Sequence, residues 1–220
     1  MDETLVKSKD TFFPELDKLG NAGDEKVAYK VGNEDWLINI APLNKDAKVW
    51  IEASFLLAKI LYALLPEHFP QPIKLEFTMA DAYDSYLSPD KEIKIPKIKV
   101  GALRRMELIT GNPVEEFDQY REERADAENK IEALGVGYAA IDSAFHNFII
   151  AKRGQDGRDK AVYMDSPNPY IRSKVPEPTV DIMTLRQAIN KIPDESLRSQ
   201  TLTDLAHYEE IVGKIVNNKS

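Results

Sequence analysis

A single long helical pattern among short strand patterns is the feature that most limits how this chain can fold. Residues 47–65 carry apolar side chains at positions 51, 55, 58, 61, 62 and 65, which is the spacing of one helix face. Pro66 and Pro70 follow and end the pattern, because proline cannot continue a helix. Strand patterns lie on both sides, at 26–31, 36–41, 73–77 and 97–108. Because helices and strands do not alternate, the sequence predicts an α+β fold rather than repeated βαβ units.

The second half of the sequence reads as mainly helical. We expect helices over 114–134, 179–191 and 195–216, with Gly135 ending the first. Two short apolar strands are predicted at 148–151 and 161–164, and residues 81–89 read as an insertion or loop. The sequence Gly111-Asn112-Pro113 breaks the chain between the two halves. We therefore predict a strand-rich N-terminal part, residues 1–110, and a mainly helical C-terminal part, residues 111–220.

Composition excludes several classes of protein and site. The chain of 220 residues fits one domain or two small lobes, and its net charge of −8 argues against a nucleic-acid partner. There is no cysteine, which excludes disulfides, thiolate zinc sites and cysteine nucleophiles. His68, His146 and His207 lack the spacing of zinc ligands. No apolar run is long enough to span a membrane and no signal peptide is visible, so we expect a cytoplasmic protein.

Three polar residues have a spacing that suits phosphoryl transfer. Asp142 precedes Asn147 by five residues, and Asp165 follows the second of the two predicted apolar strands. Kinase-type transfer uses one Asp to accept the proton of the attacking hydroxyl, and an Asn and another Asp to hold Mg²⁺. Each residue also has an ordinary structural interpretation: a turn-forming Asp142, a loop amide at Asn147, and an Asp165 that ends a strand. The spacing alone is therefore weak.

The segments that precede these residues occur in an order found in one family. A glycine-containing turn at 19–27 comes first, followed by the predicted hairpin, a helix with an acidic residue, a strand at 105–110 that runs into Gly111, and a second helix. Together with Asp142, Asn147 and Asp165, this order resembles the protein-kinase-like fold, close to the aminoglycoside-phosphotransferase and RIO-type branch, over about residues 15–170. The resemblance implies a small strand-rich N-lobe with one helix, a short mainly helical C-lobe, and ATP with Mg²⁺ in the cleft.

The resemblance also implies roles for five residues outside the Asp and Asn set. Gly20 and Gly23 correspond to the phosphate-binding turn, and Glu107 belongs to the strand whose backbone would bind adenine. Asn39 occupies the position of the strand lysine that pairs with the nucleotide phosphates, and Glu52 occupies that of its glutamate partner. The alternatives are a surface turn for the glycines and a solvated or helix-dipole-stabilised charge for Glu52.

The sequence departs from the family at informative places. Asn39 carries no charge, so Lys26 or Lys30 on the neighbouring strand would have to supply the cation, and nothing in the sequence requires that. Ala140 and Ile141 stand where kinases have His and Arg before the catalytic Asp. Neither Phe nor Gly follows Asp165.

Three hypotheses follow from these patterns. The first is an ATP- and Mg²⁺-dependent phosphotransferase acting on an unknown hydroxyl acceptor, with Asp142 as the base and Asn147 and Asp165 as metal ligands. The second is an inactive kinase-like (pseudokinase) module that binds or regulates another molecule. The third is an unrelated α+β protein in which these positions coincide by chance. The sequence identifies neither the acceptor nor the oligomeric state.

Overall fold

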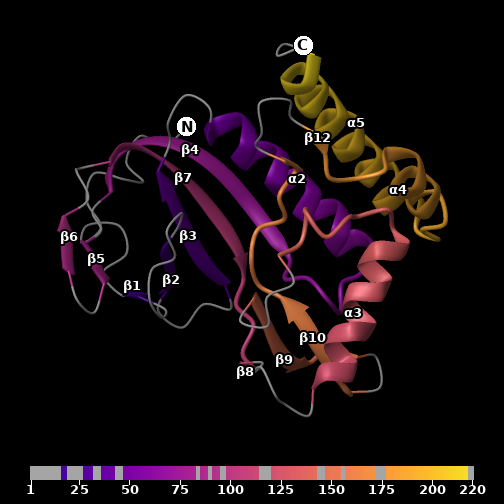
Figure 1. Ribbon diagram of the computed structural model, residues 1–220, viewed down its shortest axis with the longest axis horizontal. Coiled ribbons are helices and arrows are strands. Elements are labelled where there is room, and N and C mark those ends of the chain that lie inside the picture. Colours follow the sequence, from indigo (N-terminus) through magenta and orange to yellow (C-terminus); the bar gives the residue numbers. More distant parts are fainter. Residues whose placement is uncertain are drawn as a thin grey trace. The chain divides into compact units, whose positions relative to one another are not determined.

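The protein is a mixed α+β protein whose described strands pair antiparallel (Figure 1). The computed structural model describes residues 16–18, 27–31, 36–42, 47–82, 85–88, 91–94, 98–113, 120–142, 147–154, 157–171 and 177–217. The chain divides into two compact units. Unit 1 comprises Met1–Ile51 and Pro72–Ile109, and unit 2 comprises Glu52–Gln71 and Thr110–Ser220. The predicted boundary at 110–113 differs from this division because residues 52–71 belong to unit 2.

Unit 1 is built on one antiparallel sheet of five strands. Their order is β1 (Leu16–Lys18), β2 (Val27–Val31), β3 (Trp36–Pro42), β7 (Ile98–Glu107) and β4 (Pro72–Ala82). The hairpin predicted at 26–31 and 36–41 is confirmed, because β2 and β3 are consecutive antiparallel neighbours. The alternation of apolar and polar residues in these segments suits a sheet with one covered face.

A second hairpin in unit 1 corrects the sequence prediction. Residues 81–89 were expected to be an insertion or loop, but β5 (Ser85–Ser88) pairs with β6 (Lys91–Lys94). Tyr86 and Leu87 favour an extended conformation. Strand β6 begins three residues after β5 ends, and pairing with it satisfies the backbone groups of these two residues. Short strands of this kind lack the longer alternation that makes a strand visible in sequence.

Helix α2 (Ala47–Leu64) confirms the predicted helix at 47–65. It begins in unit 1 and has most of its residues in unit 2. Its buried residues lie around most of its circumference: Trp50, Ile51, Ala53, Ser54, Leu56, Leu57, Ile60 and Leu61. A helix that is apolar on nearly all sides is stable only when it is surrounded by protein, so α2 is a core element rather than a surface helix.

Unit 2 combines a small sheet with the other described helices. The sheet has the order β10 (Asp159–Tyr163), β9 (Phe148–Lys152) and β8 (Asn112–Pro113), and a two-stranded pair joins β11 (Tyr170–Ile171) to β12 (Glu177–Pro178). The helices are α3 (Arg121–Ala133), α4 (Ile182–Ile189) and α5 (Glu195–Asn217). Helix α3 lies beside β10, as Figure 1 shows. Among the described residues, no helix is long and apolar enough to cross a membrane.

Gly135 ends α3 as predicted and also joins α3 to α4. Its φ of +78° is the left-handed conformation that glycine adopts without strain, and its amide donates to the Glu132 carbonyl at 2.8 Å. A Cβ at this position would lie 2.9 Å from the Cβ of Thr184 in α4. Asp181, which caps α4 through its side chain, donates its own amide to the Gly135 carbonyl at 2.8 Å. Any other residue at position 135 would therefore strain the turn and push α4 away.

Candidate functional site

The end of the β9–β10 hairpin brings together Asn147 and Asp165. Asn147 directly precedes β9, and Asp165 follows β10 by two residues. In the antiparallel register Tyr163 lies opposite Phe148, and the Met164 amide donates to the Asn147 carbonyl at 2.8 Å. The pairing of two consecutive strands thus places two residues that are far apart in the sequence at one end of one hairpin.

The side chain of Asn147 links Asp142 to the same end of the hairpin. The Nδ2 of Asn147 donates to the backbone carbonyl of Asp142 at 3.1 Å, which orients the amide so that its Oδ1 is the atom available to a cation. The Asp142 side chain is exposed, while the preceding Ile141 is buried and anchors the segment. Asp142 and Asn147 are therefore neighbours, with the Asp142 carboxylate toward solvent.

Asp165 is held by its own turn. The Ser166 amide donates to Oδ1 of Asp165 at 2.7 Å, and the Asp165 side chain is half-buried. A backbone N–H on one carboxylate oxygen restricts rotation of the group.

Tyr163 is buried next to the two carboxylates. Its ring packs edge-on against Phe148, with centroids 5.4 Å apart, and against Phe69 at 6.1 Å. Among the described groups its hydroxyl has no hydrogen-bond partner of ordinary geometry. Burial raises the pKa of Tyr163, and the negative charges of Asp165 and Asp142 raise it further, against an opposing effect of the Asp142 backbone. The buried Tyr163 hydroxyl next to the carboxylates of Asp142 and Asp165 makes this end of the hairpin polar but shielded from water.

The donor set at this hairpin end fits Mg²⁺. Mg²⁺ prefers oxygen ligands and is commonly held by one or two side chains together with substrate phosphates. The Oδ1 of Asn147 and the carboxylate of Asp165 are such ligands, and they are fixed by the backbone bonds given above. Within the described ranges, no group of three or more carboxylate or imidazole side chains is placed to hold a metal ion. Mg²⁺ held by these two side chains would complete its shell with water or with oxygen atoms of a bound substrate.

The remaining predicted residues are distributed over both units. Asn39 lies in β3 and Glu107 is the last residue of β7, both in unit 1. Asn39 is paired with Arg104 of β7 on one side and with Ala28 of β2 on the other. Gly20 and Gly23 lie outside the described residues.

Glu52 contacts α5. Its Oε1 lies 3.6 Å from Nε2 of His207, and both side chains are partly exposed. Two turns further along α2 and about one turn earlier in α5, the Lys59 ammonium lies 2.7 Å from the carboxylate of Asp204, which is buried. The Lys59–Asp204 ion pair and the Glu52–His207 contact thus join α2 to α5, which sequence patterns of single helices cannot reveal.

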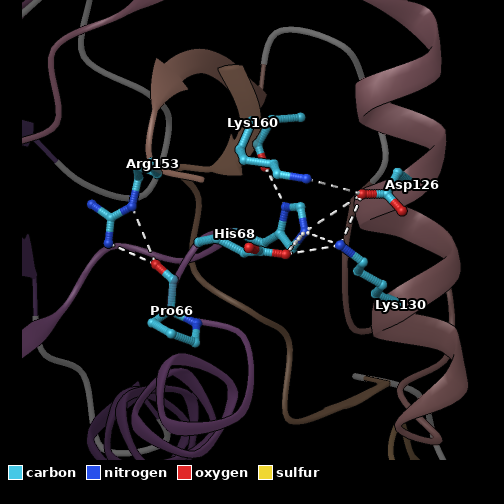
Figure 2. Close-up of polar contacts among 8 residues, drawn as sticks. Pro66, His68, Asp126, Lys130, Arg153 and Lys160 are labelled. Atoms are coloured by element: carbon cyan, nitrogen blue, oxygen red, sulfur yellow. Dashed lines mark hydrogen bonds and ion pairs between the residues drawn. The ribbon is translucent and has the colours of Figure 1, made fainter. Parts of the chain in front are cut away.

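The sequence patterns did not identify the cluster of polar residues around the buried His68 (Figure 2). His68 lies in the turn after α2, and its side chain is fully buried. Its Nε2 is 3.1 Å from Oε1 of Glu67 and 3.2 Å from Nζ of Lys130, and Asp126 bonds the same lysine at 2.9 Å. Lys160 reaches Asp126 from β10 at 3.8 Å. We name these five residues the His68 cluster.

The hydrogen bonds of His68 fix its tautomer. Nδ1 lies 2.9 Å from the Ala161 carbonyl, which can only accept, so Nδ1 carries the proton. In the neutral ring Nε2 is then bare and accepts from Lys130. Burial lowers the pKa of His68 and Lys130 lowers it too, although the Ala161 carbonyl, Glu67 and Asp126 act in the opposite direction. His68 is therefore a neutral hydrogen-bonding group near neutral pH.

The Lys130 ammonium holds the acids of this cluster. A hydrogen bond from Lys130 lowers the pKa of Glu67 and that of Asp126. Burial opposes the charge on Lys130, but the hydrogen bonds to Glu67 and Asp126 outweigh it and raise the pKa of Lys130. All three groups are accordingly charged around neutral pH.

The turn that carries His68 is attached to both strands of the hairpin. The carbonyl of His68 accepts from the Tyr163 amide at 2.9 Å, on the edge of β10 opposite β9. The Arg153 guanidinium, just after β9, donates to the carbonyl of Pro66 at 2.7 Å (Figure 2). It also donates to the carbonyl of Phe69 at 3.3 Å. The edge strand β10 is thus covered by residue 68, and the strand that leads to Asp165 is held on both edges.

Comparison with known proteins assigns neither a family nor a function to this chain. No protein-family model matches this chain, and no curated protein sequence matches it.

Proposed function

We propose that this protein is a kinase-like phosphotransferase that moves the terminal phosphoryl group of ATP to a hydroxyl acceptor. The described part of unit 2 would supply the reacting side chains. The observation that carries the proposal is the meeting of Asp142, Asn147 and Asp165 at one hairpin end. The order of elements supports it, because a strand with residue 39 and a helix with Glu52 precede that hairpin.

In the proposed reaction Asp142 accepts the proton of the acceptor hydroxyl. The acceptor oxygen forms a bond to the terminal phosphorus, the bond from that phosphorus to the bridging oxygen breaks, and ADP leaves. Asn147 and Asp165 would hold Mg²⁺, which supplies neutralisation of phosphate charge when bound. The exposed position of Asp142 suits a base that must reach a hydroxyl on a second substrate.

A second candidate function is an inactive kinase-like module that binds a partner. The observation that favours it is the uncharged Asn39 in β3, at the position where kinases use lysine to pair with the phosphates. Such a module would bind nucleotide weakly or not at all and would transfer no phosphate.

The test is Mg²⁺-dependent ATP binding, measured by calorimetry on the wild-type protein and on Asp165→Ala. We expect binding that requires Mg²⁺ and is lost in Asp165→Ala, because the remaining Asn147 cannot hold the metal alone. Asp159→Ala is the matched control, since Asp159 is an exposed carboxylate at the opposite end of the same strand. That control should bind as the wild type does.

The catalytic assignment is tested with Asp142→Ala and a panel of small hydroxyl compounds and proteins as acceptors. Loss of the base should lower turnover by about 10²- to 10⁴-fold and leave ATP binding intact. Wild-type turnover in Asp142→Ala would refute the assignment. Mg²⁺-dependent binding without transfer to any acceptor would argue against the phosphotransferase. No ATP binding at all would refute it and would favour the second candidate or an unrelated fold.

A further inference from the structure

The Tyr163 side chain is held rigidly next to the candidate site. It is fully buried, and its ring packs edge-on against Phe148, its register partner in β9, and against Phe69. The Tyr163 amide donates to the His68 carbonyl at 2.9 Å. Because residues of unit 2 fix both the ring and the main chain, the hydroxyl has one defined place.

That place is beside the main chain of Asp142. Burial raises the pKa of Tyr163, as do the charges of Asp165 and Asp142, whereas the Asp142 backbone lowers it, which is the effect of an N–H directed at the phenol oxygen. The hydroxyl therefore keeps its proton and acts through contacts rather than through ionisation. Among the described groups it has no hydrogen bond of ordinary geometry. Such a buried hydroxyl lowers stability relative to a phenyl ring of the same shape, so folding alone does not account for it.

The segment that carries Asp142 is fixed on its buried side. Ala140 and Ile141, which precede it, are buried, and the Nδ2 of Asn147 donates to the Asp142 carbonyl at 3.1 Å. The Asp142 side chain is exposed. Tyr163 thus touches residue 142 from the interior, while the carboxylate faces the side from which an acceptor would approach.

We propose that Tyr163 is a positioning residue for the base Asp142. The inference rests on the proposed function, because it assigns Tyr163 to the transfer step of that reaction. The hydroxyl supports the main chain of residue 142 and keeps the carboxylate within reach of the acceptor. Hydrogen bonds at catalytic sites are often long or poorly aligned until the substrate binds, so this contact is expected to tighten at that stage. A displacement of about 1 Å in a reacting group can slow a reaction by about 10²-fold.

Tyr208 provides a matched control. It is also a fully buried tyrosine of unit 2, but its hydroxyl donates to the Pro169 carbonyl at 2.8 Å. Phenylalanine at either position removes one hydroxyl and keeps the ring. Tyr208→Phe leaves a buried carbonyl without its donor and should lower the melting temperature, whereas Tyr163→Phe should melt at or above the wild-type temperature.

The experiment measures steady-state formation of ADP from ATP and Mg²⁺, with water as the hydroxyl acceptor, for the wild type, Tyr163→Phe and Tyr208→Phe. Their melting temperatures are measured in the same buffer. We expect Tyr163→Phe to lower kcat about tenfold, the effect of one hydrogen bond, and to leave the KM for ATP and the affinity for Mg²⁺ unchanged. Tyr208→Phe should keep the wild-type kcat and KM.

A double variant tests whether Tyr163 acts through Asp142. Tyr163→Phe should not slow Asp142→Ala any further, because the base that it positions is already gone. An unchanged kcat in Tyr163→Phe, a lower melting temperature or weaker Mg²⁺ binding in that variant, or independent losses in the double variant would overturn the inference while the proposed function stands. A wild-type protein that forms no ADP would refute the proposed function itself and the inference with it.

Discussion

Unit 2 contains two histidine–glutamate pairs, and they are built in different ways. His68 and Glu67 lie 3.1 Å apart in the turn after α2, with a fully buried ring and Lys130, Asp126 and Lys160 around it. His207 and Glu52 lie 3.6 Å apart between α5 and α2, with both side chains partly exposed. The first pair belongs to a hydrogen-bonded network, and the second is a contact in solvent.

The difference teaches that the distance between two polar side chains does not by itself measure what their contact contributes to stability. A buried group must be satisfied by its neighbours, so removing one member leaves the others without partners. An exposed group exchanges its partner for water at little cost. We therefore expect the two pairs to respond very differently to the same substitution.

The largest effect is expected for His68→Ala. The substitution removes the donor to the Ala161 carbonyl and leaves a buried acceptor unsatisfied, which costs about 1–3 kcal/mol, before the loss of ring packing is added. His207→Ala, the matched change in the exposed pair, should alter the free energy of unfolding by less than about 0.5 kcal/mol. Urea unfolding near neutral pH measures both, and equal effects would contradict the distinction between the two pairs.

The next effect concerns pH. Because the folded pKa of His68 is lowered from 6.5, the unfolded state takes up its proton first as the pH falls. The stability that neutral His68 contributes is therefore complete above pH 6.5 and is lost as the pH falls through its folded pKa. The loss is at most about 1.4 kcal/mol per pH unit, the slope for one proton.

The charged groups that face His68 lose their contributions to stability in a different pH range from His68. The pKa values of Glu67 and Asp126 are lowered from 4.5 and 3.8, so their contributions are lost only in more acidic solution. The raised pKa of Lys130 keeps it charged throughout, and Lys160 reaches only Asp126 in this cluster. Unfolding of His68→Asn, which keeps a donor near Nδ1 and cannot titrate, should lose the slope that the wild type shows below pH 6.5. A slope that persists would place its origin elsewhere.

The smallest effect is expected for Glu52→Gln. It neutralises the carboxylate that faces His207 without changing its size, and an exposed ion pair contributes less than about 1 kcal/mol. The coupling between Glu52→Gln and His207→Ala in a double-mutant cycle should be near zero in high salt. A coupling as large as that between His68 and Lys130 would show that the α2–α5 contact is also a satisfied network.

Local patterns predicted most of the elements. Periodicity and the positions of glycine and proline predicted the helix at 47–65, the hairpin at 26–41 and the two strands between Asp142 and Asp165. These signals depend on neighbouring residues only. The juxtaposition of Asn147 and Asp165 was also accessible, because two consecutive strands with a short turn pair as a hairpin.

Contacts between distant segments could not be predicted in the same way. The bond from His68 to Ala161 spans 93 residues, and the register that pairs Asn39 with Arg104 depends on how β3 and β7 align. Alternation indicated which residues of β3 share a face, but not which residue of β7 stands opposite each of them. A single buried histidine or arginine also leaves no periodic signal, so its partners become visible only in three dimensions.

The attachment of residue 68 to β10 has a consequence for the order in which the protein folds. A hairpin such as β9–β10 closes a short loop and forms early, whereas the bonds from residue 68 close a loop of 93 residues and more, which is slower because more chain entropy is lost first. The segment leading to Asp165 therefore acquires its second edge late, after α2 has docked. We therefore expect the local hairpin and turn to bring Asp165 beside Asn147 early, and the bonds from residue 68 to fix the segment that leads to Asp165 later.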